Sequence, residues 1–395
     1  MKRAGRLAGF LALNRDIVLL LGAIVLIGSG EEMWMRFLPK YLEELGASVL
    51  LIGLFDALKT LLGAVYAFPG GVIVDRWGHR RAFVLFSLLS IAGYLIVLLT
   101  ASRAAVIIGM FLFLAWSNLS LPATFSLVGR SLPASKHAMG IGIQSLIKRI
   151  PILIGPIVGG LLIDRLGILR GVHAGVAISI GMAAAALWLQ NAIKSDDTLA
   201  AAPQSNFLRL LRNFSPPLRR LLFSDILIRF CERIPFAWVV IYAMDNCGVT
   251  ATQVGVLIAV EMLAAIACYV PTSYLADRFG KEPFVILTFI FFTLFPLSLM
   301  AATNFAALTV AFAIRGLKEF GEPARKSLII SYAPAEARGR TIGAYYLLRD
   351  TVVTTGSFAG AALWKLSPQI NFGCAALFGV LGTVLYIATR QCKEL

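Results

Sequence analysis

The chain has 395 residues, of which 58% are hydrophobic and 14% are charged, and its mean hydropathy is +0.82. Soluble domains carry about 25% charged residues, so this composition excludes an ordinary soluble fold. A formal net charge of +15 would suggest a nucleic-acid partner if the basic residues were clustered. They lie instead between long apolar segments, and we therefore expect no nucleic-acid partner.

Twelve apolar segments of about twenty residues follow one another along the chain, each long enough to cross a hydrocarbon core as a helix. The sequence therefore predicts an all-α membrane protein with twelve transmembrane helices. We place the spans, to within a few residues, at 17–39, 49–71, 82–102, 104–128, 140–163, 170–192, 218–243, 251–273, 283–302, 305–328, 341–363 and 369–389.

The basic residues indicate which way the helices run. With an even number of spans both termini share one side, and that side holds most of the Lys and Arg residues. By the positive-inside rule both termini are cytoplasmic. The apolar run after Asp16 is too long for a signal peptide and is typical of a first transmembrane helix. We predict a monomeric, multi-pass protein of a bacterial inner membrane. The loops on the opposite side carry only Lys40, Arg103, Arg165, Arg170 and Lys365.

A short polar word occurs twice between apolar segments, which indicates an internal duplication. The first copy runs from Gly71 to Arg81 (GVIVDRWGHRR) and the second from Ser273 to Lys281 (SYLADRFGK). Parallel repeats of this kind are one architecture of secondary transporters. We predict two pseudo-symmetric six-helix bundles, 1–192 and 218–395, joined by a cytoplasmic linker, 193–217. Shared positions include Gly46 with Gly248, Pro69 with Pro271, Asp75 with Asp277, and Gly155 with Gly356.

The linker leaves two interpretations open. The segment from Phe207 to Phe214 (FLRLLRNF) has the pattern of a basic amphipathic turn that could lie on the inner leaflet. It is also compatible with an ordinary polar linker. Pro216 and Pro217 end it before the seventh span.

The repeated word resembles a motif of the major facilitator superfamily. The resemblance to this superfamily covers nearly the whole length of the chain. The resemblance implies a loop between helices 2 and 3 in which Gly71 permits close helix approach and Asp75 and Arg76 form a charge relay. It also implies that the aspartate lies near the N-terminal end of helix 11 and joins the two halves while the outside is open. The predicted cytoplasmic gate comprises Gly71, Asp75, Arg76, Gly78, Arg80 and Arg81, with Asp277, Arg278 and Gly280 in the second copy.

The fifth span is similar to the antiporter motif of that superfamily, a row of small residues ending in GPxxGG. Here the motif consists of Gly142, Gly155, Pro156, Gly159 and Gly160, with Pro151 in place of the middle glycine. The resemblance favours export. The alternative is simple packing, because small residues let membrane helices approach closely.

We single out nine acids and nine bases inside the predicted spans, where ionisable residues are costly and usually functional. Four same-helix groups have the spacing of one helix face: Glu32 with Arg36, Arg229 with Arg233 around Glu232, Arg315 with Glu319, and Lys318 with Glu322. Such pairs could line a wet cavity without touching a substrate. The acids are Glu31, Glu32, Asp56, Asp225, Glu232, Glu261, Glu319, Glu322 and Asp350, and the bases are Arg36, Lys59, Lys148, Arg149, Arg229, Arg233, Arg315, Lys318 and Arg349.

The resemblance implies that helices 1, 4, 7 and 10 line a central cavity. Three of these helices carry charges of both signs, whereas a cavity for greasy compounds would be mainly apolar and aromatic. We therefore predict a small polar, charged or zwitterionic organic solute as substrate. The candidate cavity residues are Glu31, Glu32, Arg36, Trp116, Asn118, Glu232, Arg233, Arg315, Lys318, Glu319 and Glu322.

The sequence contains no GxxxxGK[ST] phosphate loop, so ATP hydrolysis in this chain is excluded. Five cysteines and three histidines lack the spacing of a zinc or disulfide framework. We expect no metal, no cofactor and no enzymatic activity. Protons are the expected coupling ion, because a carboxylate in a low-dielectric site can load and release a proton. Glu261, the only charged residue in the eighth span, is the first candidate unless a neighbouring helix supplies a base.

Comparison of the two halves predicts two ion pairs between them. Lys59 maps on Glu261 and Arg149 maps on Asp350, and each correspondence reverses the charge. The resemblance implies that helix 2 faces helix 11 and helix 5 faces helix 8, which would pair Lys59 with Asp350 and Glu261 with Arg149. The alternatives are static bridges or a pair within helix 2, between Asp56 and Lys59.

These observations favour a secondary transporter that works by rocker-switch alternating access and exports its solute in exchange for protons. A proton-coupled uptake symporter is the alternative within the same class. A lipid flippase or a non-transporting membrane receptor is the alternative from a different class, since a fold does not fix a function.

The relay in the first polar word yields a prediction. Asp75→Asn should impair transport and leave membrane insertion and thermal stability nearly unchanged, because it removes a charge from an interface formed in only one state. Transport rates and unfolding temperatures of the purified variant would test this. A wild-type rate in a well-folded variant would rule out the relay.

Overall fold

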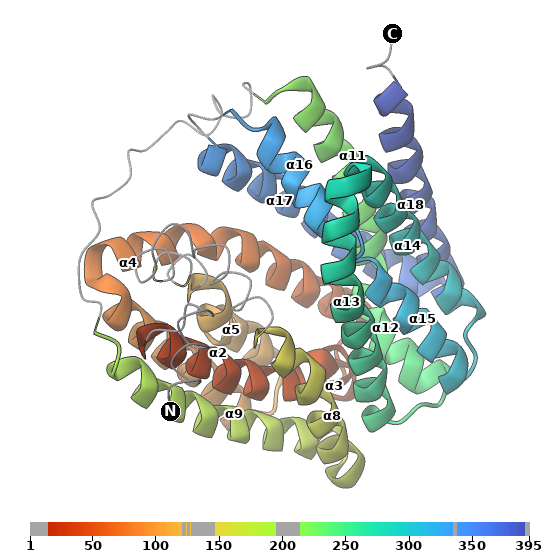
Figure 1. The fold of residues 1–395 in the computed structure, drawn as a ribbon. Helices are drawn as coiled ribbons and strands as arrows, with labels where there is room; N and C mark the ends of the chain where they lie inside the picture. The colour runs from red at the N-terminus through yellow and green to blue at the C-terminus, as the bar shows by residue number, and fades with distance from the viewer. Residues whose placement is uncertain are drawn as a thin grey trace, which may run out of the picture. The chain divides into compact units, whose positions relative to one another are not determined.

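The computed structural model describes residues 15–120, 124, 127, 147–194, 214–334 and 338–391. The described residues form helices and no strands (Figure 1). The chain divides into two compact units. Unit 1 consists of Met1–Gly46 and Val65–Ala202, and unit 2 of Ala47–Ala64 and Pro203–Leu395. Gly142 and most of the predicted linker, 195–213, lie outside the described residues, and the predicted domain boundaries stay predictions.

In unit 1 the first predicted span is a run of three helical pieces. They are α2 (Arg15–Trp34), the 3₁₀ turn η1 (Met35–Phe37) and α3 (Leu38–Glu44). The second and third spans form one long element, α4 (Val49–Leu99), which is broken at Gly78 (φ 77°). A positive φ suits glycine, so the sequence turns there at little cost. The first part of α4, up to Ala64, belongs to unit 2.

Further helices of unit 1 in the described part of the chain include α5 (Arg103–Phe113), α8 (Arg149–Leu166) and α9 (Ile168–Asn191). The Ser102 side chain caps α5 by accepting a hydrogen bond from the backbone N–H of Ala105, as N-cap serines commonly do. α2 packs against both α8 and α9, which also pack on each other.

The glycines of the helix-5 motif allow α8 to lie directly on α2. A Cβ at Gly155 would come 2.7 Å from Cβ of Glu32, and a Cβ at Gly159 would overlap the carbonyl oxygen of Met33. Small residues are therefore needed at this contact, as expected for close helix packing in a membrane. This packing role exists whether or not the motif also serves export.

Besides the first part of α4, unit 2 contains the seventh predicted span, which is α11 (Pro216–Phe236), α12 (Trp238–Ile241) and a π-helical turn, η3 (Tyr242–Asn246). Then follow α13 (Ala251–Phe279), α14 (Glu282–Ala301), α15 (Phe305–Leu317) and α16 (Glu322–Tyr332). The last two helices are α17 (Arg338–Leu366) and α18 (Pro368–Gln391). α11 packs on α17 and α18, α13 on α15, and α14 on both α15 and α18.

The tenth predicted span, expected as one helix over 305–328, is two helices. α15 ends at Leu317 and α16 begins at Glu322. The intervening turn is held by the backbone N–H of Gly321, which donates to the side-chain oxygen of Thr288 on α14. A Cβ at Gly321 would overlap the carbonyl oxygen of Phe284, so the close approach requires glycine. The break changes the direction of the side chains that follow it.

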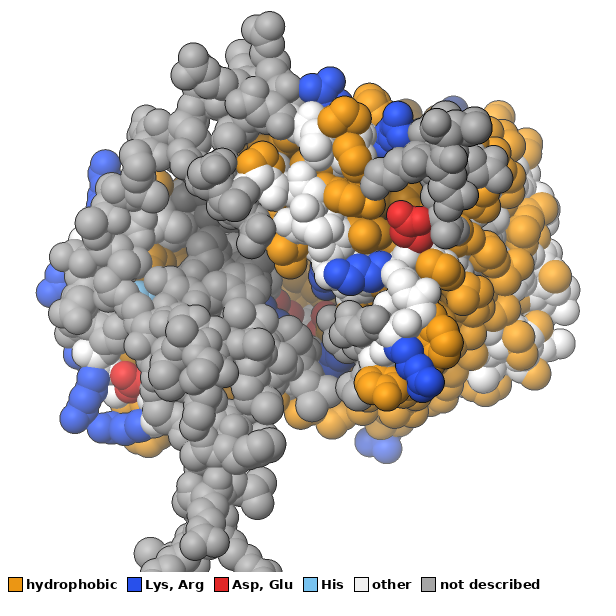
Figure 2. All heavy atoms as spheres, turned by 45° about the horizontal axis from the view of Figure 1, so that its top comes forward, with side chains coloured by type: hydrophobic (Ala, Val, Ile, Leu, Met, Phe, Trp, Pro, Cys, Tyr) orange, Lys and Arg blue, Asp and Glu red, His pale blue; other side chains and the backbone are white. Residues whose placement is uncertain are grey.

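The helices of unit 2 have a buried inner side and an apolar outer surface. The core includes the fully buried Phe289 and Tyr345. Figure 2 shows hydrophobic side chains over much of the visible surface on the side where α14 and α18 lie in Figure 1. Apolar outer surfaces are expected where lipid is the solvent. Exposed residues on these two helices include Leu287, Ile290, Leu294, Leu297, Leu377, Val380, Leu381 and Val384.

Within the described part of the chain, eight helices are long and apolar enough to cross a membrane. They correspond to the predicted spans 1–4, 6, 8, 9 and 12. The remaining predicted spans, 5, 7, 10 and 11, carry charged residues, such as Arg149 in α8 and Asp225 in α11.

The contact between α8 and α2 yields a stability prediction. Gly159→Ala should lower the free energy of unfolding, because overpacking costs about 1–3 kcal/mol and exceeds the gain of up to about 1 kcal/mol from helix propensity. Gly181→Ala on α9 is the matched control, since a Cβ there meets nothing within 4 Å. Thermal unfolding in one detergent should show a loss for the first variant only. Equal behaviour of the two variants would contradict the packing.

Candidate functional site

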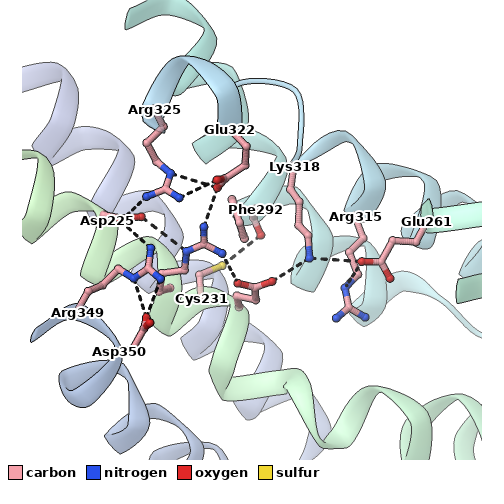
Figure 3. A network of polar contacts seen from close by, with 12 residues as sticks. Asp225, Cys231, Glu261, Phe292, Arg315, Lys318, Glu322, Arg325, Arg349 and Asp350 are labelled. Carbon is pink, nitrogen blue, oxygen red and sulfur yellow. Dashed lines mark hydrogen bonds and ion pairs between the residues drawn. The ribbon is translucent and has the colours of Figure 1, made fainter. Parts of the chain in front are cut away.

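A buried carboxylate on α11 binds cationic groups from two other helices of unit 2 (Figure 3). Oδ2 of Asp225 lies 2.6 Å from Nη1 of Arg325 on α16 and 3.3 Å from Nη1 of Arg349 on α17. The Tyr345 hydroxyl donates to the same oxygen over 3.0 Å. Asp225 and Tyr345 are fully buried. Asp225 thus ties α11 to α16 and α17.

A second carboxylate offsets the excess of guanidinium groups around Asp225. The carboxylate oxygens of Glu322 lie 2.7 Å from Arg325 and 2.7 Å from Arg229. Arg229 also contacts Glu232, one turn further along α11, over 2.8 Å. Bonds between guanidinium and carboxylate groups are the strong class of hydrogen bond, and arginine favours them by its planar shape.

The network continues along α11, α13 and α15. Nζ of Lys318 lies between two acids, 2.8 Å from Glu232 and 3.4 Å from Glu261. Glu261 also accepts Arg315, whose Nε is 3.2 Å away. Figure 3 shows the chain of contacts running from Arg349 and Asp350 at one end to Arg315 and Glu261 at the other.

Aromatic rings flank the cations of this network. The guanidinium carbon of Arg315 lies 4.9 Å from the ring centre of Phe295 and 5.7 Å from that of Phe236. Arg229 lies over Phe292 at 5.1 Å. Cation–π contacts at such distances are favourable and stronger away from water. The rings also offer flat apolar surface beside the charges.

Burial differs between parts of the network. The side chains of Asp225 and Arg325 are 1% and 2% exposed, whereas those of Lys318 and Glu232 are 14% and 16% exposed. A charge without solvent must keep its partner, but a partly solvated pair can exchange one partner for another. We therefore divide the network into a structural end at Asp225 and an accessible end at Glu232 and Lys318.

Unit 1 contains a different acidic site, in which hydroxyl groups hold a buried carboxylate. Glu31 on α2 accepts a hydrogen bond from Tyr94 over 2.7 Å and a short one from Ser117. Trp34 packs edge-on against Tyr94 and donates from its indole nitrogen to Ser179 over 3.0 Å. Hydroxyl groups can both donate and accept hydrogen bonds, unlike guanidinium groups.

The first part of α4, within unit 2, places another predicted acid beside α11 and α17. Asp56 is buried, 3.7 Å from Arg233, and accepts a hydrogen bond from Ser357. A Cβ at Gly53 would collide with Ala361, so glycine permits this close approach. The guanidinium of Arg233 also lies over Phe236 at 4.7 Å.

The structure brings many of the predicted cavity residues together, with partners that differ from the sequence spacing. Two of the four predicted same-helix groups contain an observed ion pair. Glu32 binds Arg36 over 2.9 Å, and Arg229 binds Glu232. Arg315 contacts Glu261, and Lys318 contacts Glu232 and Glu261. The neighbouring helix therefore does supply bases to Glu261, so the condition that favoured it for proton coupling is not met.

The remaining predicted residues are spread over both units. Trp116 is buried against Phe83, and Asn118 is half-buried. Asp350 contacts Arg349 over 2.7 Å, and Lys59 lies over the Phe236 ring at 6.0 Å. The pairs of Lys59 with Asp350 and of Glu261 with Arg149 stay predictions. In the gate motifs, Arg76 and Arg278 are exposed, and the side chains of Asp75 and Asp277 lie outside the described residues.

Sequence reasoning missed Arg325 and Tyr345, and it gave Asp225 no role. Arg325 lies within the predicted tenth span and three residues after Glu322, so helical spacing could have identified it. Tyr345 and Tyr94 gave no comparable indication, because a tyrosine in a span is unremarkable until its hydroxyl partner is known.

Comparison with known proteins identifies the class of molecule. The sequence model of the Major Facilitator Superfamily matches residues 20–244 and 221–391, so the chain belongs to this superfamily. The predictions of a transporter rather than an enzyme, and of two six-helix bundles, are thereby confirmed. The chain is a multi-pass membrane protein and a secondary transporter of small molecules.

Particular relatives and solved structures agree with this class. The chain is 24% identical to the multidrug resistance protein MdtG of Proteus mirabilis, over 91% of this chain and 90% of that protein. It is 25% identical to MdtG of Citrobacter koseri, over 94% and 92%. A POT family transporter in complex with 5-aminolevulinic acid has a TM-score of 0.80 at 15% identity and 95% coverage of both chains. The nucleoside transporter NupG has a TM-score of 0.81 at 10% identity, covering 95% of this chain and 99% of that one.

The structural end of the network yields a stability prediction. Asp225→Asn should lower the free energy of unfolding by about 3–5 kcal/mol, because it leaves buried guanidinium groups without compensation. Glu44→Gln is the control, since Glu44 is 47% exposed and 3.9 Å from Lys40, and surface pairs contribute about 0–1 kcal/mol. Chemical unfolding of both variants would measure the difference. A cost for Asp225→Asn no larger than the control's would contradict the structural assignment.

Proposed function

We propose that this protein exports a small organic solute that carries ionised groups, in exchange for protons, by rocker-switch alternating access. The observation that carries the proposal is the accessible end of the network in unit 2. There Nζ of Lys318 lies 2.8 Å from Glu232 and 3.4 Å from Glu261, which brings charges of both signs together. A charged or zwitterionic solute can replace one of these partners without leaving a charge unpaired.

The aromatic rings beside the charges extend the substrate class. Phe236, Phe292 and Phe295 lie within 6 Å of cationic groups, and such rings can also cover the apolar part of a solute. Export rather than uptake is supported by the names of the relatives, which are multidrug resistance proteins. The helix-5 motif is compatible with the same direction.

Proton coupling is assigned to Glu31 in unit 1. Two of its hydrogen-bond partners, Tyr94 and Ser117, are hydroxyl groups, which can donate to an ionised carboxylate and accept from a protonated one. These two hydrogen bonds can therefore be made in either protonation state. The partners of Asp225 and Glu322 include arginines, which only donate, and these acids are less suited to carry a proton.

The location follows from the same class. A bacterial inner membrane with both termini in the cytoplasm agrees with the distribution of Lys and Arg in the sequence, and the gate words then face the cytoplasm. The unit that transports is proposed to be the monomer, because each chain contains both halves.

The test combines a binding screen with measurements of transport driven by a pH gradient and of counterflow exchange. A thermal-shift screen of charged and zwitterionic solutes should yield a compound that raises the unfolding temperature, as any ligand of the native state does. In proteoliposomes an imposed pH gradient should then drive accumulation of this compound. A compound that binds but does not respond to the gradient would rule out proton coupling.

Variants distinguish the proposed role of Glu31 in proton coupling from the proposed role of Lys318 in solute binding. Glu31→Gln should abolish accumulation driven by the pH gradient and retain counterflow exchange of labelled and unlabelled solute, which requires no net proton movement. Lys318→Gln should weaken binding at least tenfold and impair both modes. Glu44→Gln serves as control and should behave as wild type. Gradient-driven transport at the wild-type rate in Glu31→Gln would exclude Glu31 as the proton site.

A further inference from the structure

A groove on the surface of unit 1, apart from the charge network, has the character of a lipid site. It has a volume of about 530 Å³ and lies between the second part of α4 and the end of α9. Its polar end is formed by Trp77, Arg80, Arg81 and Asn191. Its apolar part is formed by Val84, Leu85 and Leu88 of α4.

The groove is built from two helices that are firmly joined. Ser87 on α4 donates a hydrogen bond to Gln190 on α9 over 2.9 Å, and both side chains are fully buried. This bond lies next to Asn191 at the edge of the groove. The groove is therefore a fixed feature of unit 1.

Its position along the helices matches a membrane surface. The apolar spans Arg76–Leu99 and Ile168–Asn191 have one end each at the groove. Trp77 is 51% exposed and Trp188, one turn before Asn191, is 77% exposed. Exposed tryptophans near span ends are typical of the level of lipid headgroups. Leu88, 52% exposed, lies further toward the hydrocarbon.

The positive charge at the polar end of the groove favours binding of an anion. Among the described residues, no acid forms an ion pair with Arg80 or Arg81. Guanidinium groups bind phosphate through paired hydrogen bonds, and basic pockets between membrane helices on the cytoplasmic side suit anionic headgroups. We propose that this groove binds one anionic phospholipid of the cytoplasmic leaflet. Arg80 and Arg81 hold its phosphate, and Val84, Leu85 and Leu88 contact an acyl chain.

Fluorescence quenching in nanodiscs tests the proposal. Phosphatidylcholine nanodiscs contain a small fraction of brominated phosphatidylglycerol or, in parallel, brominated phosphatidylcholine, and bromine quenches nearby tryptophans. The contribution of Trp77 is the difference between wild type and Trp77→Phe. We expect phosphatidylglycerol to quench Trp77 at a much lower content than phosphatidylcholine does.

Charge variants identify the binding residues. Arg80→Gln with Arg81→Gln should reduce the preference for phosphatidylglycerol roughly 30-fold, since each basic residue at an anionic surface contributes about a fivefold effect. Arg80→Lys with Arg81→Lys should retain most of the preference. Arg165→Gln with Arg170→Gln, exposed positions at the opposite ends of the spans, should retain it fully.

Three outcomes would overturn the proposal. The first is equal quenching by the two lipids, and the second is a preference for phosphatidylglycerol that survives in the double Gln variant. The third is a loss of the preference on adding inorganic phosphate that exceeds the loss caused by sodium chloride of equal ionic strength. The last result would indicate a site for free phosphate. A fall of the preference with ionic strength alone is expected from screening.

Discussion

A charge inside a membrane protein needs an opposite charge or a hydrogen-bonding partner, because hydrocarbon offers neither. In unit 2 this constraint is concentrated at Asp225, where one buried carboxylate accepts Arg325, Arg349 and Tyr345. Three helices converge on this anion, and removing it would leave their cations facing one another. Glu322 completes the arrangement by neutralising Arg229 and the far side of Arg325. The placement of the more accessible charges therefore depends on a group that no solute needs to touch.

The difference in burial between Asp225 and the pair of Lys318 with Glu232 is what allows the proposal that one set of charges supports both folding and binding. At the Asp225 end, the cost of separating a pair is the full cost of a desolvated charge. At the Lys318 end, water reaches the side chains, and a carboxylate or amine of a solute can take the place of a protein group. Aromatic rings lie against neighbouring cations of the network, Arg229 and Arg315, so the proposed exchange would take place beside side chains that are already held in position.

The sequence predicted the twelve spans because hydrophobic length is a local property. It also predicted which spans carry buried charge, for the same reason. It predicted only some of the partners of these charges. Helical spacing pairs Arg315 with Glu319 and Lys318 with Glu322, but the helix ends at Leu317 and the turn up to Gly321 removes the spacing on which that inference relied. Arg315 and Lys318 reach Glu261 on α13, and Lys318 reaches Glu232 on α11. Contacts between helices distant in sequence depend on tertiary packing, which a single sequence does not specify.

The two predicted halves align as repeats in the sequence, yet they hold buried charge in different ways. The offset that aligns Asp75 with Asp277 also aligns Glu31 with Arg233, so corresponding depths carry opposite charges. Glu31 accepts hydrogen bonds from hydroxyl groups, whereas Arg233 lies beside an acid and an aromatic ring. On this division the proton and the solute bind in separate units and do not compete for one carboxylate. Coupling between them must then come from a difference in the affinity of each site between the two conformations of the transporter.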